Sequence, residues 1–541
     1  MNGNAGPRQA ASLSHFLAQV TVFYLVLPSA IFAFGWLRPP YSLVSIALLA
    51  CCPAILIREI RFHLSAQNLA LLLSNWRRQK AATRIWPLVA LLLIAIWLLL
   101  SGTGGFGFQN TDYRASNALL KDLVMQNWPI TVAVSGVEKP VVYYFGYYLP
   151  AALVGKGFGW ETANLFLFLW TYLGAVLSFM WFWRFTRIKD LSALHKLLPL
   201  VLIFVFAGGL DLVGNTFLRN ELFKKISSHN EWWAGYFQYS SNTTLLFWVP
   251  QQAVASWLVT GLLINSEFSS RDLEFAALGI SGLVIWSPFG VLGVAPFLLL
   301  LVFRVAFRYP KYLTGRGAIL VSVTSLWVGI VNLLFVTGNQ FNFPIGFIWQ
   351  TADHLRNLAK YFAAFVFLEF GFLALLILML FLLGKVFTRA PGDISFRDVS
   401  NNWLRNLHHQ FKIIPSQFHL FLVSLVVLTG LPAYRIGIFN DLVMRSSIPA
   451  LFIFWAFVAK VMIDVDAGVR SRLRYLYSLI LLVLLLGCYP ASRQIVRSME
   501  DFHFGPPDIA FVSSSSDANA ADIVLQRIGD ENSLFYRYLG K

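Results

Sequence analysis

The run Phe108-Gln-Asn-Thr-Asp112-Tyr-Arg-Ala-Ser-Asn117 follows the apolar segment 85–101 and opens a polar stretch that extends to Lys156. An apolar segment of this length predicts a helix that crosses a membrane. Asp112 is then the first carboxylate on the far side, and we take it as the leading candidate for chemistry. Thr111 or Asp112 can also cap a helix, because a short side-chain oxygen accepts from the free N–H groups of the first turn. The two roles are compatible.

Two interfacial elements are predicted in this external loop, residues 103–160. A helix over residues 113–128 has one apolar side, so we expect it to lie along the membrane interface until Pro129 ends it. The segment Val141–Val154 is too short to cross comfortably, and its tyrosines, including Tyr144, are typical of an interfacial segment on the surface. The apolar side of the first helix is formed by Leu119, Leu120, Leu123, Val124 and Trp128.

The composition indicates an all-α polytopic membrane protein. Of the 541 residues, 57% are apolar and only 13% are charged, whereas a soluble protein has about 25% charged residues. A net charge of +16 would suggest nucleic acid in a soluble chain. Here the basic residues fall in short loops between apolar segments, which is a topology signal and argues against a nucleic-acid partner. The three cysteines lie within apolar segments, so neither a disulfide framework nor a thiolate metal site is indicated.

Thirteen membrane-spanning helices are predicted from apolar segments of about 20 residues. Ser287-Pro288 interrupts one long apolar run, and either a hairpin or a single kinked helix fits residues 274–303. Residues 1–490 form the transmembrane domain, and residues 491–541 form a small extracytoplasmic tail that we expect to dock on the external loops. The spans are 15–37, 41–57, 85–102, 161–183, 197–213, 245–264, 274–286, 288–303, 318–337, 361–384, 418–433, 447–463 and 475–490.

The distribution of basic residues predicts a multi-pass protein of the cell membrane, inner or plasma, with a cytoplasmic N-terminus and an extracytoplasmic C-terminus. In this orientation the cytoplasmic segments carry 24 of the 42 Lys and Arg residues. The excess disappears from every later loop if the segment Val141–Val154 is made to cross. No cleavage site is evident near the N-terminus, so the first span is expected to be a retained signal anchor.

The second external loop, residues 214–244, has the composition of a sugar site. Glu231, Trp232, Trp233 and Gln238 combine flat aromatic faces, which stack on sugar rings, with groups that hydrogen-bond hydroxyls. An aromatic belt at the headgroup level is the alternative interpretation.

The third and fourth external loops offer basic residues for a lipid-linked phosphate. An arginine fork matches two phosphate oxygens, and arginine is weakly hydrated at the membrane surface. Juxtamembrane arginines can instead anchor helices by snorkelling. The candidates are His354, Arg356 and Lys360 in the third loop and Arg435, Asp441 and Arg445 in the fourth.

Two carboxylates fall within predicted spans. Asp211 follows two glycines that allow close backbone approach, and Glu369 is the ninth residue of its span. An ionisable group at such depth costs at least about 2.5 kcal/mol unless it faces a cavity or a partner. Both residues are therefore candidates for a functional cavity, although a polar group can also hold helices together.

These features resemble the GT-C class of integral-membrane glycosyltransferases, which includes protein O-mannosyltransferases, oligosaccharyltransferases and the enzymes that add aminoarabinose to lipid A. The shared elements are many helices, a large external loop with an aspartate near its start, two interfacial helices and an external C-terminus. Asp112, helix 113–128 and segment 141–154 match these parts. Asn110-Thr-Asp112 stands where that loop often has an acidic pair. No cofactor is expected, and a divalent metal is not indicated.

The resemblance implies an inverting transfer of a sugar from a polyprenyl-phosphate donor to an extracytoplasmic acceptor, which is a glycan, a lipid or a protein. Asp112 would act as the general base, and the basic residues of the third or fourth loop would stabilise the departing phosphate. The second loop and Tyr144 would hold the sugar or the acceptor. A transporter or flippase of a lipid-linked saccharide is the alternative, with Glu369 and Asp211 as polar-path residues. A polysaccharide polymerase or ligase is a further one.

Overall fold

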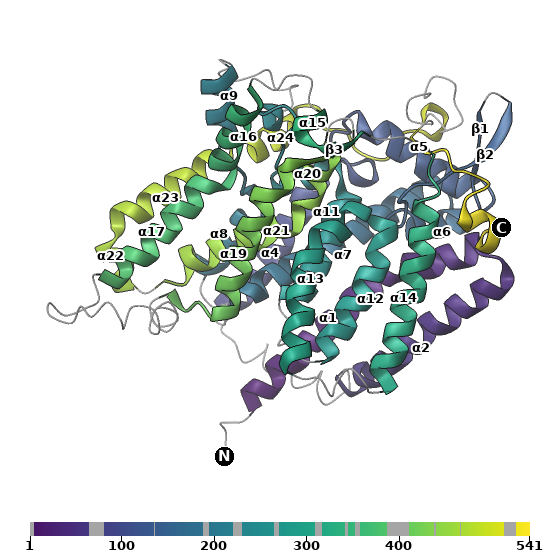
Figure 1. The fold of residues 1–541 in the computed structure, drawn as a ribbon, viewed down its shortest axis with the longest axis horizontal. Helices are drawn as coiled ribbons and strands as arrows, with labels where there is room; N and C mark the ends of the chain where they lie inside the picture. The colour runs from purple at the N-terminus through teal and green to yellow at the C-terminus, as the bar shows by residue number, and fades with distance from the viewer. Residues whose placement is uncertain are drawn as a thin grey trace.

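The computed structural model is mostly helical, with two short pairs of strands (Figure 1). In Figure 1 the N-terminus lies at the lower end of the helical bundle, and the C-terminus lies at the upper right beside β1 and β2. The structure describes residues 5–63, 81–134, 136–187, 194–219, 230–264, 270–308, 316–340, 344–351, 357–386, 411–437, 440–465, 467–512 and 526–541.

The elements of the first half are α1 (Ala5–Trp36), α2 (Pro39–His63), α4 (Ala81–Leu99), η1 (Thr103–Gly105), α5 (Asp112–Met125), β1 (Thr131–Val134), β2 (Val137–Pro140), α6 (Leu149–Phe158), α7 (Trp160–Thr186), α8 (Leu194–Phe206), α9 (Asp211–Arg219), η2 (Asn230–Trp232), α10 (Asn242–Trp248) and α11 (Pro250–Ile264). The elements of the second half are α12 (Ser270–Trp286), α13 (Pro288–Arg308), α14 (Arg316–Val336), β3 (Ile345–Phe347), α15 (Ile348–Thr351), α16 (Leu358–Val366), η5 (Phe367–Gly371), α17 (Phe372–Val386), α19 (Pro415–Gly430), η6 (Leu431–Ala433), β4 (Tyr434–Ile436), α20 (Asp441–Ser446), α21 (Ile448–Ile463), α22 (Ala467–Arg472), α23 (Arg474–Gly487), α24 (Tyr489–Glu500), η7 (Ile509–Phe511) and η9 (Phe535–Leu539). β1 pairs with β2 and β3 pairs with β4, both antiparallel.

The prediction of a mostly helical membrane protein is confirmed. Within the part of the chain that the structure describes, eight helical segments are long and apolar enough to cross a membrane. Three shorter apolar helices accompany them, Pro39–Cys51, Ile85–Leu99 and Ile448–Ile463. The eight long segments are Ser14–Trp36, Trp160–Thr186, Lys196–Arg219, Pro288–Phe307, Ala318–Val336, Leu358–Leu383, Pro415–Ala433 and Arg474–Glu500.

The apolar run around Ser287-Pro288 forms two helices, α12 and α13, that pack against each other as a hairpin. Pro288 is the first residue of α13, where its missing N–H has no helical partner to lose. The Ser287 hydroxyl accepts a hydrogen bond from the Gly290 N–H at 2.9 Å and so caps the new helix. Ser-Pro therefore ends one helix and begins the next.

Helix α5 confirms the predicted helix in the first external loop, but its cap is not the predicted one. Neither Thr111 nor Asp112 caps it; the Asn110 side chain accepts from the Asp112 N–H at 2.9 Å instead. An asparagine two residues upstream can form this local turn, which the composition of the run did not distinguish from a threonine or aspartate cap. The carboxylate of Asp112 is therefore not used to start the helix.

The segment Val141–Val154 does not lie on the surface as predicted. Most of its large side chains, including Phe145 and Tyr147, are buried, and α6 packs against α7, α5 and α1. Tyr147 also hydrogen-bonds the Thr171 hydroxyl of α7 at 2.6 Å. A dense set of tyrosines is typical of a membrane interface, but here their hydroxyls find partners inside the protein, so the aromatic rings join the core.

The C-terminal tail docks on the external loops and on the end of α1, as expected. The Val142 N–H donates to the Arg527 carbonyl at 2.9 Å, and the Lys541 N–H donates to the Trp36 carbonyl at 2.9 Å. Residues 509–511 form a 3-10 turn. The tail thus packs on one end of the helical bundle.

Gly282 of α12 should be essential for the close packing of α12 on α1. A Cβ at this position would lie 2.6 Å from the Leu25 carbonyl oxygen, which is backbone and cannot move aside. We expect Gly282→Ala to destabilise the protein by about 1–3 kcal/mol, measured by thermal unfolding in detergent. Gly157→Ala in α6 is the control, because nothing lies within 4 Å of its Cβ position. Equal unfolding temperatures for the two variants would contradict this packing.

Candidate functional site

Asp112 stands at the start of α5, where Asn110 fixes its backbone. The Asn110 amide donates to the Phe247 carbonyl at 2.8 Å, and its oxygen accepts from the Asp112 N–H. This ties the first external loop to the end of α10. The Asp112 side chain is exposed, and among the described residues no hydrogen bond to its carboxylate is formed. The carboxylate is therefore available to a substrate.

Arg445 of α20 lies in the electrostatic surroundings of Asp112, although more than 300 residues separate the two. One of its nitrogens lies 2.9 Å from the Asp441 carboxylate, and another donates to the Tyr144 hydroxyl at 2.8 Å. The guanidinium also lies over the Phe289 ring, 5.6 Å from its centroid. Three of the predicted residues, Asp441, Arg445 and Tyr144, thus form one connected group.

The charges of this group act on one another. Burial raises the pKa of the Asp112 carboxyl above its ordinary value; the Arg445 guanidinium opposes this increase and the Asp441 carboxylate adds to it. Burial alone would lower the pKa of Arg445, but Asp441 together with Tyr144, Tyr143 and Asp112 raises it above the ordinary value, so that the arginine keeps its charge. The Asp112 carboxylate is thus accessible but largely surrounded by protein, and it lies in the field of the permanently charged Arg445 guanidinium.

The structure adds Arg527 of the C-terminal tail, which sequence reasoning missed. Its guanidinium lies 4.9 Å from the centroid of the Tyr143 ring, and Tyr143 stacks on Tyr144 at 3.9 Å. Arg527 is buried, and its Nη1 has no hydrogen-bond partner among the described residues; the same holds for the Nε of Arg445. Buried donors of this kind need a partner such as water or a ligand. The only sequence signal for Arg527 is its position in the tail that was expected to dock here.

Arg435 occupies a separate position on β4. Its side chain is buried, donates to the Gly437 carbonyl at 3.2 Å, and lies over the Tyr236 ring at 4.5 Å. Asn440 also donates to the Tyr236 carbonyl, at 3.0 Å. These contacts join the fourth external loop to the second, so the predicted phosphate loop and the predicted sugar loop are neighbours.

The second group of polar residues is a buried acidic cluster formed by Asp211, Glu369, Glu231 and Trp233. The Trp233 indole N–H lies 3.1 Å from Asp211 Oδ1 and 3.2 Å from Glu369 Oε1. Asp211 and Glu369 thus share one indole donor. The cluster buries two carboxyl groups that belong to apolar helical segments.

Glu231 completes the acidic cluster from the second external loop. Its Oε1 accepts from the Thr244 hydroxyl at 2.7 Å and from the Ser241 N–H at 3.1 Å. Its Oε2 is buried without a partner among the described residues. Burial raises the pKa of Glu231, and the hydroxyl and N–H donors of residues 240–244 oppose that increase. Glu231 therefore holds residues 241–244 through Oε1, while Oε2 has no partner among the described residues.

The remaining predicted site residues divide by accessibility. Trp233 is fully buried, and its ring packs against Gly214, so no face is open to a sugar in this structure. Trp232 is 42% exposed and donates to Gln238. Lys360 is exposed at the start of α16. His354 and Arg356 lie outside the described residues. The acidic cluster and the group around Asp112 form two separate sets of contacts.

Comparisons with protein-family models, with curated proteins and with solved structures found no match for this chain. The chemistry of the two groups is therefore argued from their own residues. Among the described residues, no set of three or more His, Cys, Asp or Glu side chains is arranged to hold a metal ion.

Trp233→Phe should destabilise the fold, because it leaves two buried carboxylates without their shared donor. We expect a loss of about 1–3 kcal/mol, measured as a lower unfolding temperature in detergent. Trp232→Phe is the matched control, since its ring is partly exposed and its N–H donates to the amide of Gln238, which is not a buried carboxylate. A Trp233→Phe protein as stable as the control would show that the indole N–H is not needed.

Proposed function

We propose that this protein is a membrane glycosyltransferase that moves a sugar from a polyprenyl-phosphate donor to an extracytoplasmic glycan, lipid or protein. The observation that supports this most directly is the placement of Asp112, an exposed carboxylate free of helix capping, in the field of Arg445. A general base and a cation for the leaving phosphate are the two groups that such a transfer requires.

In the proposed reaction, the Asp112 carboxylate takes the proton of the acceptor hydroxyl, and that oxygen attacks the anomeric carbon of the donor sugar. The bond between this carbon and the phosphate oxygen breaks, and its electron pair leaves with the polyprenyl phosphate. The configuration at the anomeric carbon is inverted. Arg445, held by Asp441 and Tyr144, stabilises the charge on the departing phosphate, and Arg527 supplies a second buried guanidinium near the same tyrosines.

We further propose that the chain crosses the membrane thirteen times, in a GT-C-like arrangement with the N-terminus cytoplasmic and the C-terminus extracytoplasmic in the cell membrane. Each of the thirteen predicted ranges overlaps helical segments, although 197–213 crosses the break between α8 and α9 and 245–264 covers both α10 and α11. Two of the helices concerned, α11 and α12, are not among the long or the shorter apolar helices named above. Helix α11 is buried throughout. The termini lie at opposite ends of the bundle in Figure 1.

A transporter or flippase for a lipid-linked saccharide is the second candidate, and the acidic cluster favours it. Asp211 and Glu369 share the Trp233 indole N–H and belong to apolar helical segments. Buried carboxylates of this kind occur in proton-coupled pathways. A transfer assay in detergent separates the two candidates, because an enzyme works without a sealed bilayer, whereas transport requires two compartments.

Asp112→Asn should abolish sugar transfer while the protein stays folded and inserted. Removal of a general base reduces rates by about 10²–10⁴-fold, and the amide keeps the size of the side chain. Turnover is measured in detergent with a polyprenyl-phosphate sugar. Glu138→Gln is the control, since Glu138 is an exposed carboxylate of the same loop on β2. A fully active Asp112→Asn protein would remove Asp112 from the mechanism.

The pH dependence of transfer should respond in opposite directions to two substitutions. A general base works when it is deprotonated, so the rate rises with pH through the pKa of Asp112. Arg445 lowers that pKa and Asp441 raises it. We therefore expect Arg445→Gln to move the acidic limb of the kcat/KM profile to higher pH, and Asp441→Asn to move it to lower pH. Shifts in the same direction, or none, would indicate that another group sets this limb.

A further inference from the structure

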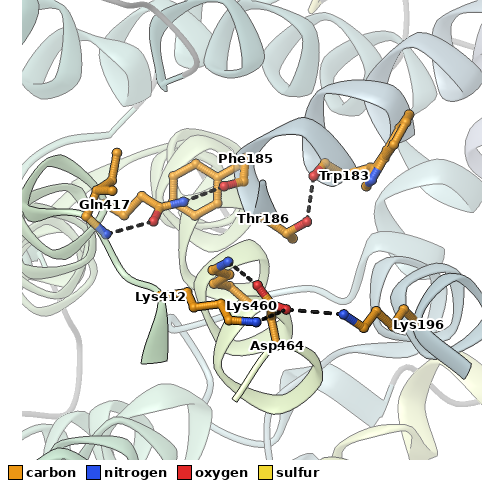
Figure 2. Close-up of polar contacts among 9 residues, drawn as sticks. Trp183, Phe185, Thr186, Lys196, Lys412, Gln417, Lys460 and Asp464 are labelled. Atoms are coloured by element: carbon orange, nitrogen blue, oxygen red, sulfur yellow. Dashed lines mark hydrogen bonds and ion pairs between the residues drawn. The ribbon is translucent and has the colours of Figure 1, made fainter. Parts of the chain in front are cut away.

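Three lysines from separate parts of the chain converge on one aspartate (Figure 2). Lys196 comes from the first turn of α8, Lys412 from the segment before α19, and Lys460 from the last turns of α21. Their ammonium nitrogens lie 3.3, 3.4 and 2.6 Å from the nearest Asp464 oxygen. We call these four residues the lysine cluster. It lies at helix ends that the charge distribution predicts to be cytoplasmic.

Within the described residues, the lysine cluster carries more positive than negative charge. Among the described residues, Asp464 is the only carboxylate that forms an ion pair with these lysines. The single negative charge therefore faces three positive ones. The Lys460 side chain is 2% exposed and that of Asp464 8%, so water screens this excess poorly. A further anion would relieve the repulsion between the lysines.

Two lysines of the cluster are partly accessible to solvent. The side chains of Lys196 and Lys412 are 24% and 59% exposed, and both reach the same oxygen, Asp464 Oδ1. An ammonium group has three donors, and each of these two uses one of them on Asp464. The other donors can reach a ligand from the solvent or from the lipid headgroups. Lys460 instead is bound to the other oxygen, at 2.6 Å, and is enclosed.

We propose that the lysine cluster is a binding site for a phosphate group, either of an anionic lipid headgroup or of a free phosphate. Ammonium groups bind phosphate as point charges, and the cytoplasmic leaflet is rich in anionic lipids. Lys196 and Lys412 contact the phosphate, whereas Lys460 and Asp464 hold them in place. Arg470 lies nearby, because its guanidinium donates to the Met462 carbonyl at the end of α21 at 2.8 Å. This site is independent of the proposed sugar transfer.

A purely structural role for the lysine cluster makes a different prediction. Lys460 and Asp464, four residues apart, already form a buried one-to-one ion pair. The pairs with Lys196 and Lys412 are longer and more exposed, and exposed ion pairs contribute little to stability. If these two lysines only joined the helices, their removal would change stability without changing the affinity for an anion.

The test compares the wild-type protein with the Lys196→Gln/Lys412→Gln double variant. Inorganic phosphate is titrated in detergent and followed by the unfolding temperature, and phosphatidylglycerol is titrated against phosphatidylcholine and followed by native mass spectrometry. We expect binding of the preferred probe to weaken about tenfold in the double variant. Lys139→Gln is the control, because Lys139 forms a single exposed pair with Glu531 at 3.6 Å in the external region and should bind like the wild type.

The two probes identify the source of the phosphate. Binding of phosphatidylglycerol alone indicates a lipid headgroup, and binding of inorganic phosphate indicates a free phosphate. If the double variant fails to fold, the single variant Lys412→Gln replaces it, since that side chain is the most exposed of the three. The proposal is overturned if neither probe binds the wild-type protein, or if the lysine variants bind as tightly as Lys139→Gln.

Discussion

A backbone group inside a hydrocarbon layer must find its hydrogen-bond partner within the protein. The break between α8 and α9 shows how this constraint builds the interior of the molecule. The Leu210 N–H, outside both helices, donates to the Leu368 carbonyl at 3.1 Å. Leu368 belongs to the π-helical turn η5, in which the helix is widened by one residue. A backbone N–H left free by one irregular segment thus finds its acceptor in the other irregular segment.

This pairing of irregular segments also places the acidic cluster. Glu369 follows Leu368, and Asp211 follows Leu210, so the two carboxylates meet where the backbones meet. Gly209 is required there, because a Cβ would lie 2.0 Å from the Glu369 carboxylate oxygen. The depth of Glu369 in an apolar run predicted that it would need a partner. The identity of that partner, and the indole of Trp233 between them, could not be predicted, because no local pattern records a contact between residues 136 positions apart.

The prediction of a mostly helical fold rests on neighbouring residues in the sequence and was confirmed. The burial of a segment and the grouping of site residues depend on contacts between distant segments and were not predicted. Apolar length predicted the helices, and Ser287-Pro288 correctly marked a break, because both signals are local. The burial of Val141–Val154 was missed because it depends on the tail around Arg527 and on α7, which the segment itself does not encode. The grouping of Tyr144, Asp441 and Arg445 depends on a fold that brings the first and fourth external loops together. Sequence could name these three residues as candidates, but not as neighbours.

Asp112 differs from the carboxyl groups of the acidic cluster in its accessibility to solvent. Asp211 and Glu369 are 1% and 3% exposed, and each accepts a hydrogen bond from the Trp233 indole N–H. A base must reach within hydrogen-bond distance of the hydroxyl that it deprotonates. In the proposed transfer Asp112 is the accessible carboxylate, because Asn110, and not its own carboxylate, starts α5. If aspartate were the cap, its oxygens would be turned toward the N–H groups of the helix. The asparagine two residues upstream therefore takes the structural role, and leaves the Asp112 carboxylate in the field of Arg445 for the proposed chemistry.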